Sequence, residues 1–267
     1  MPSIAHLDTS ALDTAAKFHR AMQKVGADFT GPMQSVTKRQ NLAHYLALGC
    51  PKVDGNGVVD TTPTPESLAR LLLGADFITP EEVAKARAGI VYTDEQLEGL
   101  EASFPSIEVI AWCYGNGYML IPTPPTAMSL LGIRDLNSTL FCSKENRWFV
   151  EERQIFARDD KTQVATWFAL RKGVVPNSAD KKWNEQPTFL SEVERVPNAA
   201  ELAWGLTTYK EVRGVYLMRL IRARTISVDA DGNHVSIGDS GDDGFRVNCH
   251  GGDYDYRCVG VSSARKQ

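Results

Sequence analysis

Apolar residues recur three and four positions apart through the first hundred residues of the chain, with polar residues between them. This spacing predicts short amphipathic helices in residues 9–26 and 37–50. Further along, Thr-Pro steps followed by acidic residues predict two helix starts, because proline fits the first turn of a helix. Another start is predicted at Thr93, since Gln96 lies at the spacing of a capping box. The pattern therefore predicts a mostly helical N-terminal region over residues 1–105.

Strand-like runs dominate the second part of the chain. A helix is predicted to end near the Gly-Asn-Gly step of residues 115–117, and residues 118–121 then predict a short strand. Residues 146–157 and 162–173 continue as strand-like runs. In residues 214–238, two such runs flank an Asp-Gly turn, which predicts a hairpin.

One longer helix is predicted within this strand-rich part. Pro197 occupies its start and Gly214 follows its end. Its apolar face is formed by Leu202, Leu206 and Tyr209. Strands that run together, with helices on one side, are typical of the α+β class. We therefore expect an α+β fold, in which residues 106–267 form a domain of antiparallel strands with two helices.

Composition places the chain among ordinary globular proteins. Of its 267 residues, 43% are hydrophobic and 23% are charged, and the formal net charge is −4. A nucleic-acid partner would require a concentrated basic face, so this dispersed charge predicts no nucleic-acid binding. No apolar run is long enough to span a membrane and no secretory pattern is visible, so we expect a cytoplasmic monomer without membrane insertion. The five cysteines are scattered and odd in number, and we expect reduced thiols.

Residues 248–258, with the sequence NCHGGDYDYRC, are here named the polar tract. They contain no Leu, Ile, Val, Phe or Met, although Val259–Val261 directly after them predicts a buried strand. Tyrosine offers a large rigid contact area and arginine offers a planar set of donors, so this composition is typical of a binding surface. A polar loop between the last two strands is the alternative explanation, and it stays open.

Four segments carry a resemblance to a known family. They are VPNSADKKWNEQ (175–186), VPNAAELAWGLTTY (196–209), SVDADGNHVSIG (227–238) and GVSSARK (260–266). These segments resemble the variable proteins of diversity-generating retroelements, which have a C-type lectin fold of the formylglycine-generating-enzyme type. Glu201 matches the glutamate of the Pro-Thr-Glu-Ala-Glu-Trp helix in that enzyme group. The resemblance covers about residues 106–267 and is most specific near the C-terminal end.

In such proteins a reverse transcriptase copies a template repeat with errors at adenines, and the copy replaces the last codons of the gene. The resemblance implies a non-catalytic variable protein without cofactors or metal, whose expected ligand is a protein. The implied ligand-binding residues are Asn248, Cys249, His250, Asp253, Tyr254, Asp255, Tyr256, Arg257 and Cys258. Errors at the adenines of an AAC codon cannot produce Trp, Met, Glu, Gln or Lys, and the polar tract contains none of the five. That absence is weak by itself, but every residue type in the tract is reachable from AAC.

Two alternative functions stay open. Cys249 and Cys258 could correspond to the copper-binding cysteine pair of the formylglycine-generating enzymes, although their spacing is longer than in that group. The chain would then be an oxidase. The other alternative is an interaction module whose C-terminal residues are not diversified.

The remaining polar motifs have ordinary structural explanations. The segment 229–233 begins like a calcium loop but lacks the downstream glutamate, so we expect a hairpin turn. The acidic segment 238–244 is expected to be a solvated turn, and the five histidines show no metal-ligand spacing. Trp167 and Trp204 are expected in the core, and Trp183 is a candidate to hold a loop.

Overall fold

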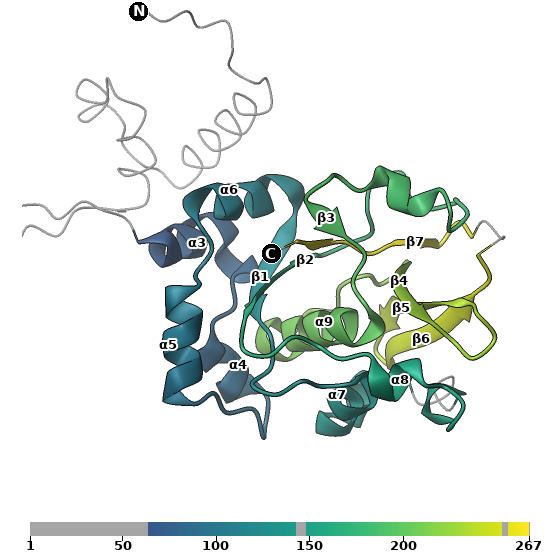
Figure 1. The fold of residues 1–267 in the computed structure, drawn as a ribbon, viewed down its shortest axis with the longest axis horizontal. Coiled ribbons are helices and arrows are strands. Elements are labelled where there is room, and N and C mark those ends of the chain that lie inside the picture. The colour runs from purple at the N-terminus through teal and green to yellow at the C-terminus, as the bar shows by residue number, and fades with distance from the viewer. Residues whose placement is uncertain (1–63, 143–147, 253–255, 267) are drawn as a thin grey trace, which may run out of the picture. The chain divides into compact units, whose positions relative to one another are not determined.

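A computed structural model of the chain describes residues 64–142, 148–252 and 256–266. The chain divides into two compact units, Met1–Leu68 and Ala69–Gln267. The helices predicted in residues 9–26 and 37–50 lie outside the described residues. The described part is a mixed structure of helices and mainly antiparallel sheets (Figure 1). This agrees with the prediction of the α+β class.

The helices before the first strand follow local sequence signals. They are α3 (Pro65–Leu73), α4 (Pro80–Ala86), α5 (Asp94–Ala102) and α6 (Ile107–Asn116). Capping boxes begin α4 at Thr79 and α5 at Thr93, and the one at Thr93 uses Gln96 as predicted. Helix α6 ends at Gly117, whose φ of 72° is left-handed and suits glycine. Helices α4 and α5 belong to the same unit as the strands, whereas the sequence pattern placed them in the N-terminal region.

The first sheet is antiparallel and has the strand order β1-β2-β8-β3. Its strands are β1 (Tyr118–Pro122), β2 (Trp167–Arg171), β8 (Ala264–Arg265) and β3 (Glu194–Arg195). A Cβ atom added at Gly205, which lies in the long helix between the sheets, would clash with the Leu170 side chain of β2. This glycine therefore lets the helix approach one face of the first sheet closely.

The second sheet has the order β6-β5-β4-β7. Its strands are β4 (Arg222–Val228), β5 (His234–Gly241), β6 (Gly244–His250) and β7 (Val259–Val261). Strand β7 pairs with β4 in parallel, and the other pairs are antiparallel. The predicted hairpin and the predicted buried strand at Val259–Val261 are confirmed, although the hairpin begins at Arg222 rather than near Gly214 and β8 follows as a further strand.

Helix α9 (Ala199–Arg213) lies between the two sheets (Figure 1). Asn198 caps its start and Gly214 ends it, close to the predicted bounds. The sequence pattern predicted that only one face of this helix is buried. In the structure every residue from Ala199 to Tyr209 is buried, so the buried surface extends around the helix. The helix contacts strands of both sheets and also helices α4 and α7 (Leu130–Leu136), and a helix surrounded in this way is buried on all sides.

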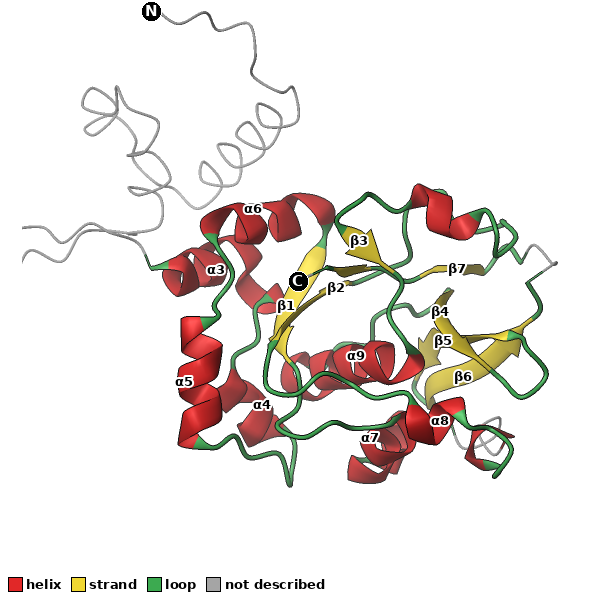
Figure 2. Cartoon of the chain, viewed as in Figure 1, coloured by secondary structure: helices red, strands yellow, loops and turns green. Residues whose placement is uncertain are grey.

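The strand predicted for residues 146–157 is wrong where the structure describes it. Trp148–Val150 forms a 3-10 turn and Phe156–Asp159 forms helix α8 (Figure 2). The Arg158 guanidinium donates hydrogen bonds to the backbone carbonyl oxygens of residues 150–152. These local bonds hold the segment in a turn, which the alternation of apolar residues did not reveal.

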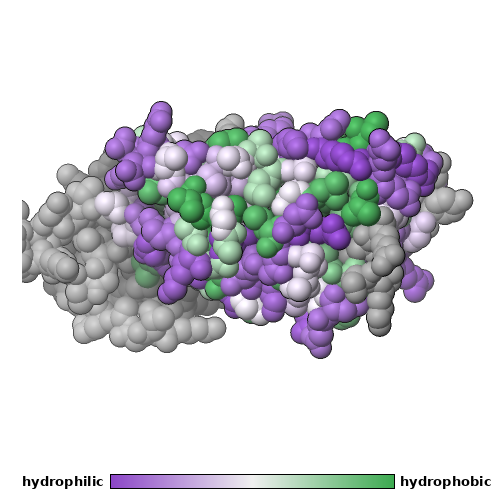
Figure 3. Space-filling model, turned by 90° about the horizontal axis from the view of Figure 1, so that it is seen from below, coloured by the Kyte–Doolittle hydropathy of each residue, from purple (hydrophilic) through white to green (hydrophobic). Residues whose placement is uncertain are grey.

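Apolar side chains do not gather into one area on the face shown in Figure 3. The view from below shows several separate hydrophobic patches among hydrophilic side chains. None of the helices in the described part of the chain is long and apolar enough to cross a bilayer.

Candidate ligand-binding surface

The second sheet has a core face and an outer face. Residues paired directly across an antiparallel ladder point to the same side, so the register separates the two faces. The core-face residues are at most 1% exposed: Ala223, Val235, Ile237, Phe245 and Val247. The outer face carries Arg222, Arg224, Ser236, Asn248 and His250. Strand β6 therefore places two residues of the polar tract, Asn248 and His250, on the outer face.

The polar tract spans the end of β6 and the approach to β7. Its three strand residues are half-buried or buried: Asn248, Cys249 and His250. Three predicted site residues lie outside the described residues: Asp253, Tyr254 and Asp255. Its last three residues become progressively exposed: Tyr256 is half-buried, whereas Arg257 and Cys258 are exposed. The tract is thus partly packed against the sheet and partly displayed.

His250 belongs to the packed part of the tract. Its Nδ1 lies 3.0 Å from the Ser236 Oγ, and its ring lies edge-to-face against Tyr256 with centroids 4.6 Å apart. Burial, together with the positive charges of Arg222 and Arg224, lowers the pKa of His250 to about 4. The imidazole is therefore neutral at neutral pH, as its packed position requires.

Arg224 joins the sheet, the tract and a neighbouring loop. Its side chain is fully buried although it lies on the outer face. Its Nη1 donates hydrogen bonds to the Gln186 Oε1 at 3.1 Å and the Lys181 carbonyl oxygen at 3.2 Å, and its Nη2 donates to the Gly251 carbonyl oxygen at 3.1 Å. The Tyr256 ring covers the guanidinium at 5.7 Å. Burial lowers the pKa of Arg224, and these acceptors stabilise the cation that burial disfavours.

The loop between β2 and β3 is hydrogen-bonded to the tract backbone at Gly252 and at Tyr256. The Trp183 N–H donates to the Gly252 carbonyl, and the Asp180 N–H donates to the Tyr256 carbonyl. The buried Gln186 donates its Nε2 hydrogen bond to the Val259 carbonyl oxygen at 3.0 Å. These bonds use backbone atoms of the tract or of β7, so they do not depend on which side chains the tract carries.

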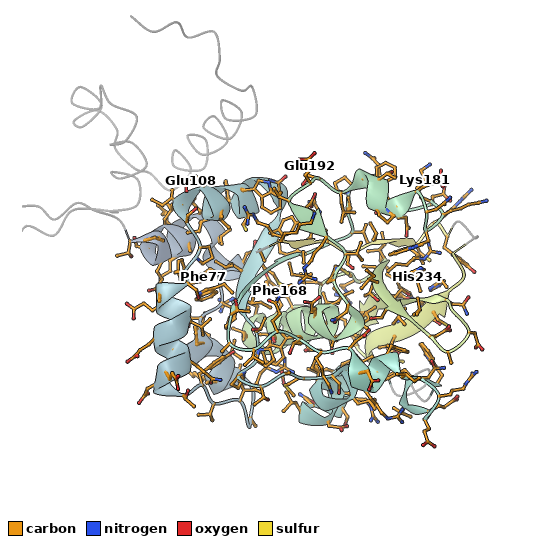
Figure 4. All side chains as sticks on the ribbon, in the orientation of Figure 1. Phe77, Glu108, Phe168, Lys181, Glu192 and His234 are labelled. Atoms are coloured by element: carbon orange, nitrogen blue, oxygen red, sulfur yellow. The ribbon has the colours of Figure 1, made fainter. Side chains whose placement is uncertain are left out.

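Trp183 and His234 attach this loop to the sheet. Their rings stack with centroids 3.6 Å apart and an interplanar angle of 24°. His234 lies at the start of β5, and Figure 4 shows it in the same part of the molecule as Lys181 of the loop. Burial lowers the pKa of His234, which favours the neutral ring in this stack. The prediction that Trp183 holds a loop is confirmed.

Cys249 and Cys258 lie at opposite edges of the second sheet. Cys249 is in β6, Cys258 directly precedes β7, and β5 and β4 lie between them. Three interstrand spacings amount to about 14 Å, whereas a disulfide requires Cα atoms within about 7 Å. Burial and a hydrogen bond with Asp229 raise the pKa of Cys249 to about 11, so the thiol stays protonated. Both thiols are free, and their placement argues against a shared copper ion.

The calcium-like segment forms the turn between β4 and β5. The Asp229 Oδ1 accepts hydrogen bonds from the backbone N–H groups of Asp231 at 2.9 Å and Asn233 at 2.8 Å. Asp231 pairs with Arg153 instead of turning inward. These contacts fit the predicted hairpin turn. Within the described ranges, no group of three or more His, Cys, Asp or Glu residues could hold a metal ion.

The second acidic turn is partly solvated, as predicted, and partly paired: the Asp242 side chain is fully exposed, whereas Asp239 and Asp243 pair with arginines. The nearest oxygen–nitrogen distance is 2.8 Å between Asp239 and Arg222, and 2.9 Å between Asp243 and Arg246. The arginines come from neighbouring strands, so their partners could not be assigned from the turn sequence alone.

No family model matches the chain, and no curated protein or solved structure matches it either. Its function is therefore inferred from the surface described above and from the sequence resemblance. Sequence reasoning missed Arg224, Gln186 and His234, since a polar residue in a strand or loop is usually exposed. The one available signal was Trp183, which the sequence marks as a candidate to hold a loop.

Proposed function

We propose that the chain is a non-catalytic ligand-binding protein whose polar tract is diversified by a retroelement through adenine-directed mutagenesis. The observation that supports this most is the attachment of the tract. Its backbone is bound by Arg224 and by the loop carrying Trp183, while Arg257 and Cys258 are exposed. A backbone held by residues outside the tract lets the tract side chains change without refolding the domain.

A protein is the proposed ligand. Tyrosine and arginine are the residues most often found at the energetic centres of protein interfaces. Aspartate and asparagine add short polar contacts beside them. Arg257 is exposed beside a tract backbone that hydrogen bonds already hold, and this order reduces the entropy lost on binding.

We further propose a C-type lectin fold of the formylglycine-generating-enzyme type for residues 106–267. Two small sheets that enclose one long helix support this proposal, together with the position of Glu201 in that helix. Glu201 is 5% exposed, and its carboxylate accepts two hydrogen bonds of 2.7 Å from the Arg195 guanidinium. The glutamate thereby joins α9 to β3, which gives it a structural role.

Sequencing the gene and its surroundings in a population tests the proposed diversification. We expect a reverse-transcriptase gene and a near-copy of the codons for residues 248–258 that differs at adenines. Variants should differ mainly within the tract. Val259–Val261 should stay constant, because a polar side chain in this buried strand would leave an unsatisfied group at about 1–3 kcal/mol.

Two outcomes contradict this proposal. Differences spread evenly along the chain would favour an undiversified interaction module, and so would Lys or Glu appearing freely in the tract. The oxidase alternative is tested separately by titrating the reduced protein with Cu(I), with Cys258→Ser as the matched variant. We expect no stoichiometric binding that depends on Cys258, because Cys249 lies across the sheet from it.

A further inference from the structure

The first sheet carries a cavity on the face turned away from α9. The cavity has a volume of about 300 Å³ and is lined by β1, β2, β8, the start of α6 and the segment before it. Leu120 pairs with Ala169, and Leu170 pairs with Ala264, so the register places Ala169 beside Arg265. The methyl group of Ala169 leaves space between two longer side chains. The small side chain of Ala169 therefore forms the floor of the cavity.

The walls of this cavity are largely apolar. Trp167 and Leu120 line it from the sheet, and Val109 and Pro105 line it from the opposite side. Trp167 is fixed, since its Nε1 donates to the Leu100 carbonyl oxygen at 2.8 Å and its ring packs against Phe104. A rigid aromatic wall beside aliphatic side chains suits an apolar body, and the volume falls at the lower end of small-molecule sites.

Two cations line the same cavity, Arg265 and Lys266, and no acidic residue is among its described lining residues. The Arg265 guanidinium lies 5.6 Å from the Trp112 ring centroid, and its Nη1 donates to the Lys266 carbonyl oxygen at 3.1 Å. Its Nε is buried, and among the described residues neither Nε nor Nη2 has a hydrogen-bond acceptor. The Nε–Nη2 edge is the edge that binds a carboxylate through two parallel hydrogen bonds.

We propose that this cavity binds a small organic monocarboxylate with an aromatic or branched aliphatic body. The carboxylate pairs with the Nε–Nη2 edge of Arg265, and the apolar body lies over Ala169 against Trp167. The bound anion would supply the acceptor that the buried Nε lacks, which removes an unsatisfied buried donor. The site is on the first sheet, so it does not depend on the function proposed for the polar tract.

The test uses 3-phenylpropionate as the probe and 3-phenylpropionamide as its neutral counterpart of the same shape. Calorimetric titration of the full chain should give saturable binding of the carboxylate and at least about tenfold weaker binding of the amide. Arg265→Gln should reduce carboxylate affinity by about tenfold or more. Arg265→Lys should give an intermediate loss, because it keeps the charge but not the two-donor edge. Ala169→Leu should abolish binding by filling the floor.

Arg171→Gln is the matched control, because it removes a guanidinium from the same face of the same sheet outside the cavity lining. It should leave the affinity unchanged, and thermal unfolding should show that each variant is folded. If Arg265→Gln does not fold, the comparison of carboxylate with amide decides the question. The proposal is overturned if 3-phenylpropionate does not bind, if the amide binds equally well, or if folded Ala169→Leu binds as the native chain does.

Discussion

The two sheets differ in what covers the face turned away from α9. The first sheet is covered by α6 and by the segment before it, where the Phe104 ring packs against Trp167 of β2 with centroids 4.8 Å apart. The second sheet is covered by a loop and the polar tract, which are held by hydrogen bonds from the buried Arg224. An apolar cover depends on the shape of each side chain, so few substitutions preserve it. A cover attached through backbone carbonyls tolerates changes in its side chains, so we expect substitutions to be tolerated better on the second sheet than on the first.

The largest expected effect lies in the helix that both sheets share. Trp204 is fully buried, and its Nε1 donates to the Pro122 carbonyl oxygen at 2.9 Å. Trp204→Ala should lower the free energy of unfolding by about 3–5 kcal/mol, measured by urea denaturation. The half-buried Trp112 provides the control, and Trp112→Ala should have a clearly smaller effect. Equal losses in the two variants would mean that α9 is not the common core.

The second prediction concerns the attachment of the tract. Arg224→Met keeps the apolar stem but leaves the acceptors at Lys181, Gln186 and Gly251 without their donor. Each buried unsatisfied acceptor costs about 1–3 kcal/mol, and partial hydration should limit the total to about 2–3 kcal/mol. Arg219→Met removes an arginine that is 66% exposed, so its effect should stay within about 0.5 kcal/mol. If the two variants have the same free energy of unfolding, Arg224 does not hold the cover of the second sheet.

The third prediction uses pH to probe the packed end of the tract. The pKa of His250 is about 4 in the folded chain, against 6.5 as its ordinary value. As the pH falls from 6.5 towards 4, the unfolded chain binds a proton that the folded chain does not, so stability is lost in this range. Between pH 7 and 4.5, the native chain should lose about 2 kcal/mol more than His250→Gln does. The measurement is the free energy of unfolding from denaturant titrations at each pH. If the native chain and His250→Gln show the same dependence on pH, His250 is exposed to solvent.

The smallest effect is expected at the displayed end of the tract. Arg257→Ala combined with Cys258→Ser should change the free energy of unfolding by less than about 0.5 kcal/mol per position, because both residues are exposed. Tyr256→Ala is the comparison variant, and it should cost more because that ring contacts Arg224 and His250. Melting temperatures measured side by side are sufficient. A loss from the double variant as large as that from Tyr256→Ala would remove the distinction between packed and displayed tract residues.

Features that depend on neighbouring residues could be predicted from the sequence. Thr93 and Gln96 form a capping box because both partners lie within one helical turn, and Gly214 ends α9 through its own backbone freedom. The hairpin turn at Asp229 is likewise held by residues within five positions. All the residues that form each of these features lie within a short segment, so the local sequence is sufficient to predict them.

Features that depend on distant pairing could not be predicted in the same way. The sequence near Arg224 does not indicate that β7 pairs with β4, because the paired residues are more than thirty positions apart in the chain. That pairing and the loop around Gln186 bury a side chain that alternation places on a solvent face. The tract was predicted as a displayed surface for the same reason, and the packing of His250 against Ser236 becomes visible only in the register of β5 and β6.

Strand β8 follows the polar tract in the sequence, so a translation fault within the tract also removes this strand from the folded chain. Ala264 and Arg265 lie between β2 and β3, and β3 is paired in the first sheet through β8. The ribosome makes residues 259–265 only after it has translated the polar tract. A change of reading frame or a stop codon within residues 248–258 therefore removes β7 from one sheet and β8 from the other. We expect such chains to fail to fold and to be degraded, so that only in-frame changes within the tract leave a folded chain.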